Sequence, residues 1–264
     1  MSMSQDSFLT RAGARIAYQL NGSGSPLGYA HGVLLSRDAV RRLELFDFDQ
    51  LASEHLLLTY DQRGHGRSTG RPVAEDYRFE NVAHDLLALM DEAGLDEPMD
   101  IVGSSLGCAA ALYAALAAPE RFGRLVLIIP PAAWDTDGKP ARQWYHDTAD
   151  RIENISAPAW LEEWAQGDPL PIFADYPQFG FTPDVPNDLL APVLHGVGSA
   201  DLPAPQDLAA LSHPTLILAW ETDPLHPVST AQRLDEHLPN SSLQIAHSVD
   251  DIKTWTHRIA EFCR

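Results

Sequence analysis

Ser105 lies in a sequence pattern that could present a serine hydroxyl as a nucleophile. It is the third residue of "GSSLG" (103–107), which fits the pattern G-x-S-x-G. The pattern follows an apolar run predicted as a strand (99–104) and opens an alanine-rich run predicted as a helix (105–118). Flanking glycines leave room for a sharp turn, and the N–H of Leu106 at the helix start can donate to an oxyanion. The ordinary alternative is a serine that caps a helix.

A serine hydroxyl alone is a weak nucleophile at neutral pH. A histidine must take its proton, and a carboxylate must orient that histidine and stabilise the charge it acquires. The chain contains 11 histidines and 37 acidic residues, so residue types alone do not identify the partners. The elements that position these side chains narrow the choice.

Short apolar runs alternate with amphipathic segments along the chain. This alternation predicts an α/β fold with a mostly parallel sheet that helices cover on both faces. A hairpin near the N-terminus, turning at residues 12–13, is expected to form an antiparallel edge. The predicted strands are 28–32, 55–61, 99–104, 124–130, 214–220 and 242–247, and the predicted helices are 37–54, 81–93, 105–118, 228–238 and 250–262.

Residues 131–210 interrupt this alternation. The segment has no clear strand and is rich in proline and aromatic residues. We therefore predict a core domain (1–130 and 211–264) with an inserted helical cap (131–210). The aromatic side chains either pack the cap itself or line an apolar pocket over the sheet. Candidate substrate-binding residues are Trp134 and Trp144 in this segment and Trp220 at the end of the 214–220 strand.

Three further stretches resemble the α/β-hydrolase family, and the resemblance covers nearly the whole chain outside the predicted cap. "AHGVLL" (30–35) is similar to the turn that supplies the second oxyanion donor, which by this match is the N–H of Val33. "YDQRGHGRS" (60–68) resembles the family's D-x-R-G-x-G-x-S loop, and "PERFGRLVLI" (119–128) resembles the connection after the nucleophile helix. The resemblance implies a nucleophile elbow at Ser105, with the N–H groups of Val33 and Leu106 as the oxyanion hole.

The same resemblance suggests the acid and the base. In this family the acid follows the strand after the cap, and the histidine comes last. In "LILAWETDPLHP" (216–227) the position of the acid is taken by Asp223, with Glu221 as the alternative. The base is then His247, after the last predicted strand. Because the glycine-containing loop that usually precedes this histidine is absent, His226 remains an alternative base or substrate contact.

Two other kinds of site are not expected. The glycines of "RGHGRSTG" (63–70) are spaced one residue too widely for a dinucleotide-binding fingerprint, so Asp61 and Arg63 are predicted to fix the geometry of this loop. No histidine pair has metal-ligand spacing beside a carboxylate, and no cysteine pair is present, so no metal is expected. The family resemblance implies that no cofactor is needed.

Composition limits the partners. A formal net charge of −19 disfavours nucleic acid and anionic membrane surfaces. No apolar run is long enough to span a bilayer, no secretory leader is recognisable, and the two cysteines do not suggest a disulfide framework. We therefore expect a cytoplasmic protein with a small-molecule substrate. The sequence does not predict its oligomeric state.

The leading hypothesis is a serine hydrolase that cleaves an ester or lactone of a small, largely apolar substrate through an acyl-enzyme. The same fold also supports cofactor-free haloperoxidases (perhydrolases) and carbon–carbon bond hydrolases, so a triad does not choose among these reactions. A third possibility is a ligand-binding or biosynthetic protein without hydrolytic activity. The shortened loop before His247 motivates this last alternative.

Overall fold

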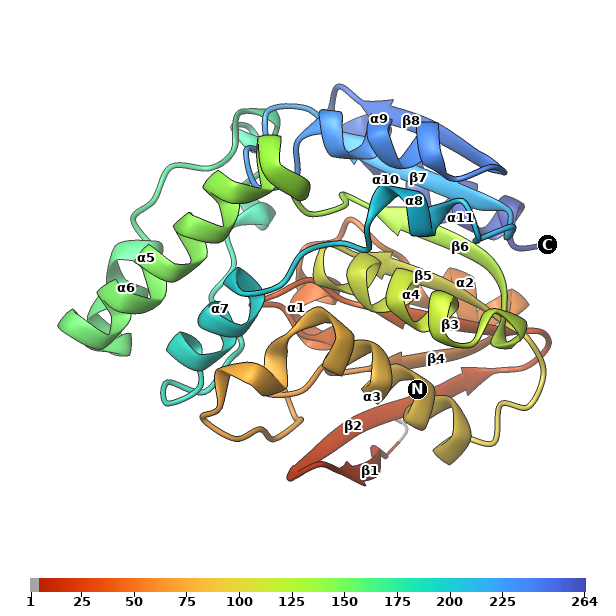
Figure 1. Ribbon diagram of the computed structural model, residues 1–264, viewed down its shortest axis with the longest axis horizontal. Coiled ribbons are helices and arrows are strands. Elements are labelled where there is room, and N and C mark those ends of the chain that lie inside the picture. Colours follow the sequence, from red (N-terminus) through yellow and green to blue (C-terminus); the bar gives the residue numbers. More distant parts are fainter. Residues whose placement is uncertain (1–4) are drawn as a thin grey trace.

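A computed structural model describes residues 5–264, and eight strands form a single sheet at its centre (Figure 1). The strand order is β1-β2-β4-β3-β5-β6-β7-β8. β2 pairs antiparallel with both β1 and β4, and all other neighbours are parallel. The strands are β1 (Ser7–Arg11), β2 (Ala14–Gly22), β3 (Pro26–Ala30), β4 (Leu56–Tyr60), β5 (Met99–Ser104), β6 (Phe122–Ile128), β7 (Thr215–Trp220) and β8 (Ser241–Ala246). The predicted α/β fold with a mostly parallel sheet is confirmed.

The predicted N-terminal hairpin is also confirmed. β1 and β2 pair antiparallel and form one edge of the sheet. The turn residues Ala12 and Gly13 both have positive φ, 46° and 76°. Two successive positive values are typical of the tight turns whose twist matches that of paired strands.

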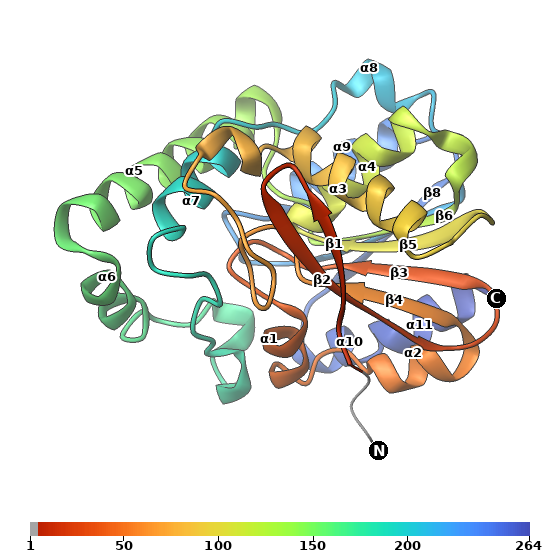
Figure 2. The same ribbon diagram turned by 90° about the horizontal axis from the view of Figure 1, so that it is seen from below.

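Helices cover both faces of the sheet, as Figure 2 shows from below. Alternate residues of each central strand point to opposite faces. In β6, Leu125 and Leu127 join the core under α3 (Phe79–Glu92), α4 (Leu106–Ala117) and α9 (Val228–His237). Val126 and Ile128 join the core under α2 (Phe48–Glu54) and α11 (Trp255–Phe262). The continuous apolar runs that predicted a doubly covered sheet therefore fill two separate cores.

The helices largely match the predicted ones, with two exceptions. The predicted helix 37–54 is two helices, because Glu44 adopts a positive φ of 53° after the first and Asp47 caps the start of the second. The predicted helix 250–262 is interrupted at Thr254, whose hydroxyl donates to the backbone of Asp251. The α-helices are α1 (Arg37–Arg42), α2 (Phe48–Glu54), α3 (Phe79–Glu92), α4 (Leu106–Ala117), α5 (Lys139–Ile155), α6 (Ala157–Trp164), α7 (Leu190–Gly198), α8 (Pro205–Leu208), α9 (Val228–His237), α10 (Val249–Lys253) and α11 (Trp255–Phe262). Within the described residues, no helix is long and apolar enough to cross a membrane.

The segment between β6 and β7 is helical and contributes no strand to the sheet. Its helices α5 and α6 lie beyond one end of the sheet in both views (Figures 1 and 2). A short turn of 3₁₀-helix (Ala74–Tyr77) packs against α7 of this segment. This arrangement agrees with an insertion at 131–210, whose role as a cap stays a prediction.

Buried ion pairs hold the loop after β4, in agreement with the prediction that Asp61 and Arg63 fix its geometry. Arg63 makes two hydrogen bonds to the carboxylate of Asp85, of 2.7 and 2.8 Å, and both side chains are buried. The carboxylate of Asp61 accepts from the backbone and side chain of Arg37 and from the backbone of Arg67. These contacts join the loop to α1 and α3 and give it a structural role.

The corner between β5 and α4 depends on close backbone approach. A Cβ added at Gly107 would overlap the carbonyl oxygen of Ala30, the last residue of β3. Because the Cβ is bonded directly to the backbone and the carbonyl belongs to it, neither can rotate away. We expect Gly107→Ala to lower the free energy of unfolding by about 3 kcal/mol, measured by urea denaturation.

A matched glycine tests that reason. A Cβ added at Gly180 would lie 3.6 Å from the nearest backbone oxygen, which is an ordinary contact. Gly180→Ala should therefore change stability by well under about 1 kcal/mol. Equal effects of the two substitutions would contradict the close-packing argument.

Candidate active site

Ser105 lies on a strained turn between β5 and α4. Its backbone has φ 52° and ψ −111°, values that a residue with a side chain rarely adopts. The turn is fixed because the Ser105 N–H donates to the carbonyl of Ile128, at 3.0 Å, and its carbonyl accepts from the N–H of Cys108, at 2.8 Å. Strain held in this way is typical of functional positions.

The structure connects Ser105 to a histidine and a carboxylate. Nε2 of His226 lies 2.8 Å from Oγ of Ser105. Nδ1 of the same ring lies 2.6 Å from Oδ2 of Asp223. The Ser105 and Asp223 side chains are buried, and that of His226 is 13 % exposed. These three groups form a continuous hydrogen-bonded chain from a hydroxyl to a carboxylate.

A single loop after β7 carries both the carboxylate and the histidine. The N–H of Leu225 donates to Oδ1 of Asp223, at 2.9 Å, and the N–H of His226 donates to the Asp223 carbonyl, at 3.3 Å. An aspartate that binds its own backbone two residues on is a common turn-former. Pro224 and Pro227 restrict the backbone on either side of the turn. The loop therefore holds the His226 ring against Asp223 before any substrate arrives.

The environment of Asp223 favours its ionised form. Burial alone would raise its pKa, but the charge and hydrogen bond of His226 outweigh burial and lower the pKa. The N–H groups of Leu225 and of the Trp220 ring, the latter 3.2 Å from Oδ2, act in the same direction. An ionised Asp223 accepts a hydrogen bond from the Nδ1–H of His226, which leaves the Nε2 lone pair directed at the serine.

His247, the predicted base, lies elsewhere. Its ring Nδ1 is 3.0 Å from the carboxylate of Glu221, the alternative acid, and its side chain is 64 % exposed. The hydrogen bond and charge of Glu221 raise the pKa of His247. The prediction that His247 faces Ser105 is thus wrong in this structure, and the alternative, His226, is the histidine beside the serine.

Strand spacing explains this correction. Ser105 follows β5 and His247 follows β8, three strands away in the sheet. Neighbouring strands are about 4.8 Å apart, so the two strand ends are separated by about 14 Å. β8 leads at once into α10, whose cap Ser248 follows His247 directly. No loop is left to carry the His247 ring back across the sheet.

The predicted oxyanion turn lies against Ser105. A side chain at Gly32 would come within 3.2 Å of the Ser105 Cβ, and Val33 lines the same cavity as Ser105. Leu106 begins α4, where the first N–H groups of a helix have no partner within the helix. The two segments that carry the predicted donors are therefore adjacent to the serine.

His31 fixes that turn. Its Nδ1 lies 2.8 Å from the carbonyl of Gly32, and its Nε2 accepts from the N–H of Gln62, at 2.9 Å. Complete burial lowers the pKa of His31 and keeps the ring neutral. Both ring nitrogens are thus occupied by backbone groups, which leaves His31 a structural role.

Ser105 and His226 open onto a cavity of about 1020 Å³. The cavity lies between the sheet end and the segment that follows β6. Among the described residues, its lining contains no lysine or arginine, and His226 is its only histidine. Apolar and aromatic side chains dominate the lining, among them Tyr29, Leu43, Trp144, Phe173, Tyr176 and Trp220.

Two of the three predicted substrate-binding tryptophans line this cavity, namely Trp144 and Trp220. Trp134 does not. Its ring N–H donates to the carbonyl of Pro203, and Arg233 lies over the ring face at 4.7 Å. Trp134 therefore packs between the inserted segment and α9, and the prediction that it contacts substrate is wrong.

Comparison with known proteins agrees with this arrangement. The sequence profile of the α/β hydrolase fold matches residues 29–166, more than half of the chain. The chain belongs to the α/β-hydrolase fold family. It is thus an enzyme of hydrolase type, and the family predicted from the sequence is confirmed.

Similar proteins of this family are themselves hydrolases. The chain is 27% identical over 199 residues to the proposed carbamate hydrolase RutD of Caulobacter segnis, covering 71% of each protein. It is 24% identical over 262 residues to 3-oxoadipate enol-lactonase 1 of Acinetobacter baylyi, covering 89% of this chain and 86% of that protein. A solved hydrolase from Pseudomonas aeruginosa superposes with a TM-score of 0.81 at 22% identity, covering 99% of both chains, and thus has the same fold.

Proposed function

We propose that this α/β-hydrolase is a serine hydrolase that cleaves a neutral, largely apolar ester or lactone through an acyl-enzyme. The observation that carries this proposal is the hydrogen-bonded chain Ser105–His226–Asp223 at the floor of an apolar cavity. A serine, an imidazole and an ionised carboxylate in this order are the groups that acyl transfer requires.

In the proposed reaction, Oγ of Ser105 attacks the substrate carbonyl while Nε2 of His226 takes the hydroxyl proton. Asp223 stabilises the imidazolium that forms. The N–H groups of Val33 and Leu106 hold the oxyanion, a contribution worth about 3 kcal/mol for each donor. His226 then gives the proton to the leaving alkoxide, and the carbon–oxygen bond of the ester breaks.

The acyl-enzyme is released by water. His226 accepts a proton from the water as it attacks the acyl carbon, and returns that proton to Oγ of Ser105 when the acid leaves. Ester and water are thereby converted to acid and alcohol. The same serine, histidine and oxyanion donors serve both halves of the reaction.

The cavity lining supports a neutral substrate. A buried carboxylate is costly unless a cation or several hydrogen bonds compensate it. No lysine or arginine of the described chain lines the cavity, and Asp168 adds a negative charge to its wall. A volume of about 1020 Å³ is at the upper end of the range for small-molecule sites, so a medium-length acyl chain or an aromatic group fits.

An ester series tests the proposal. p-Nitrophenyl pentanoate and the p-nitrophenyl monoester of succinate have acyl groups of similar length, but only the second carries a carboxylate. We expect kcat/KM to be about 100-fold higher for the pentanoate, because the carboxylate would be buried without a partner. Release of p-nitrophenol is followed spectrophotometrically, with Ser105→Ala as the control for non-enzymatic hydrolysis.

The outcomes separate two claims. Equal or faster cleavage of the succinate monoester would contradict the neutral substrate but not the hydrolase. No cleavage of either ester beyond that of Ser105→Ala, together with no fluorophosphonate adduct on Ser105, would contradict the hydrolase. The shortened loop before His247 motivates the non-hydrolytic alternative, and the 2.8 Å contact between His226 and Ser105 favours catalysis instead.

A further inference from the structure

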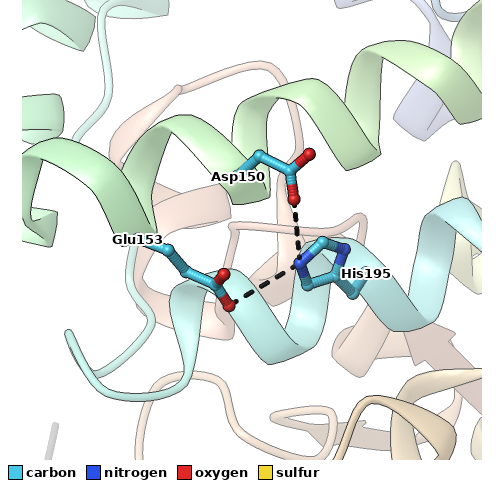
Figure 3. Close-up of side chains that lie close together, drawn as sticks. All are labelled: Asp150, Glu153 and His195. Carbon is cyan, nitrogen blue, oxygen red and sulfur yellow. Dashed lines mark ion pairs between the residues drawn. The ribbon is translucent and has the colours of Figure 1, made fainter.

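A cluster of histidines and carboxylates lies between α5 and α7, away from Ser105, His226 and Asp223. Nε2 of His195 on α7 lies 3.6 Å from Oδ1 of Asp150 and 3.7 Å from Oε1 of Glu153, both on α5. Figure 3 shows both carboxylates directed at the same ring nitrogen. From these contacts we propose that His195, Asp150 and Glu153 bind a divalent transition-metal ion of the Zn²⁺ class.

The distances fit a shared ion better than direct hydrogen bonds. At 3.6 and 3.7 Å the nitrogen and oxygens are too far apart for good hydrogen bonds. Zinc binds nitrogen and oxygen ligands at about 2.0–2.2 Å, so ligand atoms of a tetrahedral site are about 3.4 Å apart. One ligand atom from each residue lies within 4.8 Å of the others. Three protein ligands leave the fourth position to water.

A second histidine orients the first. Nδ1 of His146 lies 3.1 Å from Nδ1 of His195. When His195 donates its Nδ1 proton to His146, its Nε2 carries a lone pair that faces the two carboxylates. Metal-binding histidines usually donate their other ring N–H to a hydrogen-bond acceptor, which fixes their orientation. His146 is thus the positioning residue of the proposed site.

Local structure explains why these groups meet. His146, Asp150 and Glu153 are separated by four and three residues, so they form one stripe along α5 that faces α7. His195 is in the last turn of α7, where the helix dipole favours a positive charge. The ligands come from distant parts of the chain. Sequence spacing could therefore not reveal them, and the expectation of no metal rested on local spacing alone.

An ion at this site would join two elements behind the cavity. Trp144 and Tyr145 of α5 line the cavity, and the Cβ of Tyr145 packs against Gly198 at the end of α7. A bridge from α5 to α7 would hold this wall in place. The proposed site is therefore structural and separate from Ser105.

Zinc titration of the metal-free, untagged protein tests the proposal. Isothermal calorimetry with ZnCl₂ should show one site per chain, and Co²⁺ should give visible absorption typical of mixed nitrogen and oxygen ligation. His195→Ala and Asp150→Asn should each weaken Zn²⁺ binding by at least about 10-fold, and His146→Phe by about 10- to 100-fold. Zn²⁺ should raise the Tm of the wild type and raise that of His195→Ala by less at the same Zn²⁺ concentration.

His257→Ala is the matched control. His257 is exposed and pairs with Glu261 on α11, at 3.3 Å, so it offers the same residue types without the second carboxylate. Its substitution should leave Zn²⁺ affinity and stoichiometry unchanged. The proposal is overturned if the wild type binds no Zn²⁺, or if His195→Ala binds it as tightly as the wild type. Circular dichroism of each metal-free variant confirms that the fold is retained.

Discussion

His226→Ala should lower kcat/KM for an activated ester by about 10⁴-fold or more, whereas His247→Ala should leave it within about twofold of the wild type. The reason is that His226 lies between Ser105 and Asp223, and His247 forms an exposed pair with Glu221. His226→Ala should also abolish the rapid formation of a fluorophosphonate adduct on Ser105. Ester hydrolysis and intact-mass spectrometry with peptide mapping measure the two effects.

This comparison has a built-in control, because both substitutions remove a histidine that is paired with a carboxylate. If His247→Ala abolished activity and His226→Ala did not, the proposed roles of Ser105, His226 and Asp223 as a catalytic triad would be wrong. An adduct that forms equally fast in both variants would show that neither histidine activates Ser105. The Tm of each variant distinguishes loss of the base from loss of the fold.

Asp61→Ala should lower the free energy of unfolding at pH 7 by about 3–5 kcal/mol, because it removes one partner of a buried ion pair. The Asp61 carboxylate is 3.0 Å from Nη2 of Arg37, and both side chains are buried. The substitution leaves the guanidinium without this partner and frees the start of α1, whose N–H also donates to Asp61. Urea denaturation measures the loss. Asp91→Ala, which removes the 68 % exposed partner of Arg121, should cost under about 1 kcal/mol.

The effect of Asp61→Ala should also depend on pH. Burial alone would raise the pKa of Asp61, but the hydrogen bond and charge of Arg37 outweigh burial and lower it. A carboxylate with a lowered pKa stabilises the fold above its unfolded pKa of about 3.9. That contribution is lost as the pH falls through the lower folded pKa. The difference in the free energy of unfolding between wild type and Asp61→Ala should therefore narrow below about pH 4. A difference that grows there would contradict this assignment.

Much of the fold was predictable because its signals are local. The apolar runs of β5, β6 and β7 are continuous, and each strand lies within two residues of its predicted bounds. The corner at Ser105 was predictable because its signal, the pattern G-x-S-x-G between a strand and a helix, is contained in five consecutive residues. The helix breaks at Glu44 and Thr254 were missed because each depends on one residue's backbone or side-chain hydrogen bond.

The histidine beside Ser105 was harder to predict because its position depends on the path of a loop. The end of β8 was predicted to within one residue, so the error lay in expecting His247 to reach back to Ser105 from there. A sequence signal for His226 did exist. Asp223 and Pro224 are residues that favour a tight turn, and Pro227 directly follows His226. The residues of the cavity wall were even harder to predict from the sequence. Phe173 and Tyr176 reach it through the packing of a proline-rich segment without regular periodicity.

The position of His226 changes how the proposed catalytic residues can vary. Asp223 and His226 are carried by one turn of the loop after β7, so the acid–histidine geometry is a property of four consecutive residues. An insertion or deletion on either side of that turn moves both groups together and preserves their relation. The chain after Pro227 then carries none of the proposed proton-transfer groups, and its contribution to the cavity is made by Ile252 of α10 and Trp255 of α11, which line the wall. The proposed acid and base therefore form one four-residue unit, which we expect to be exchangeable as a whole between related proteins.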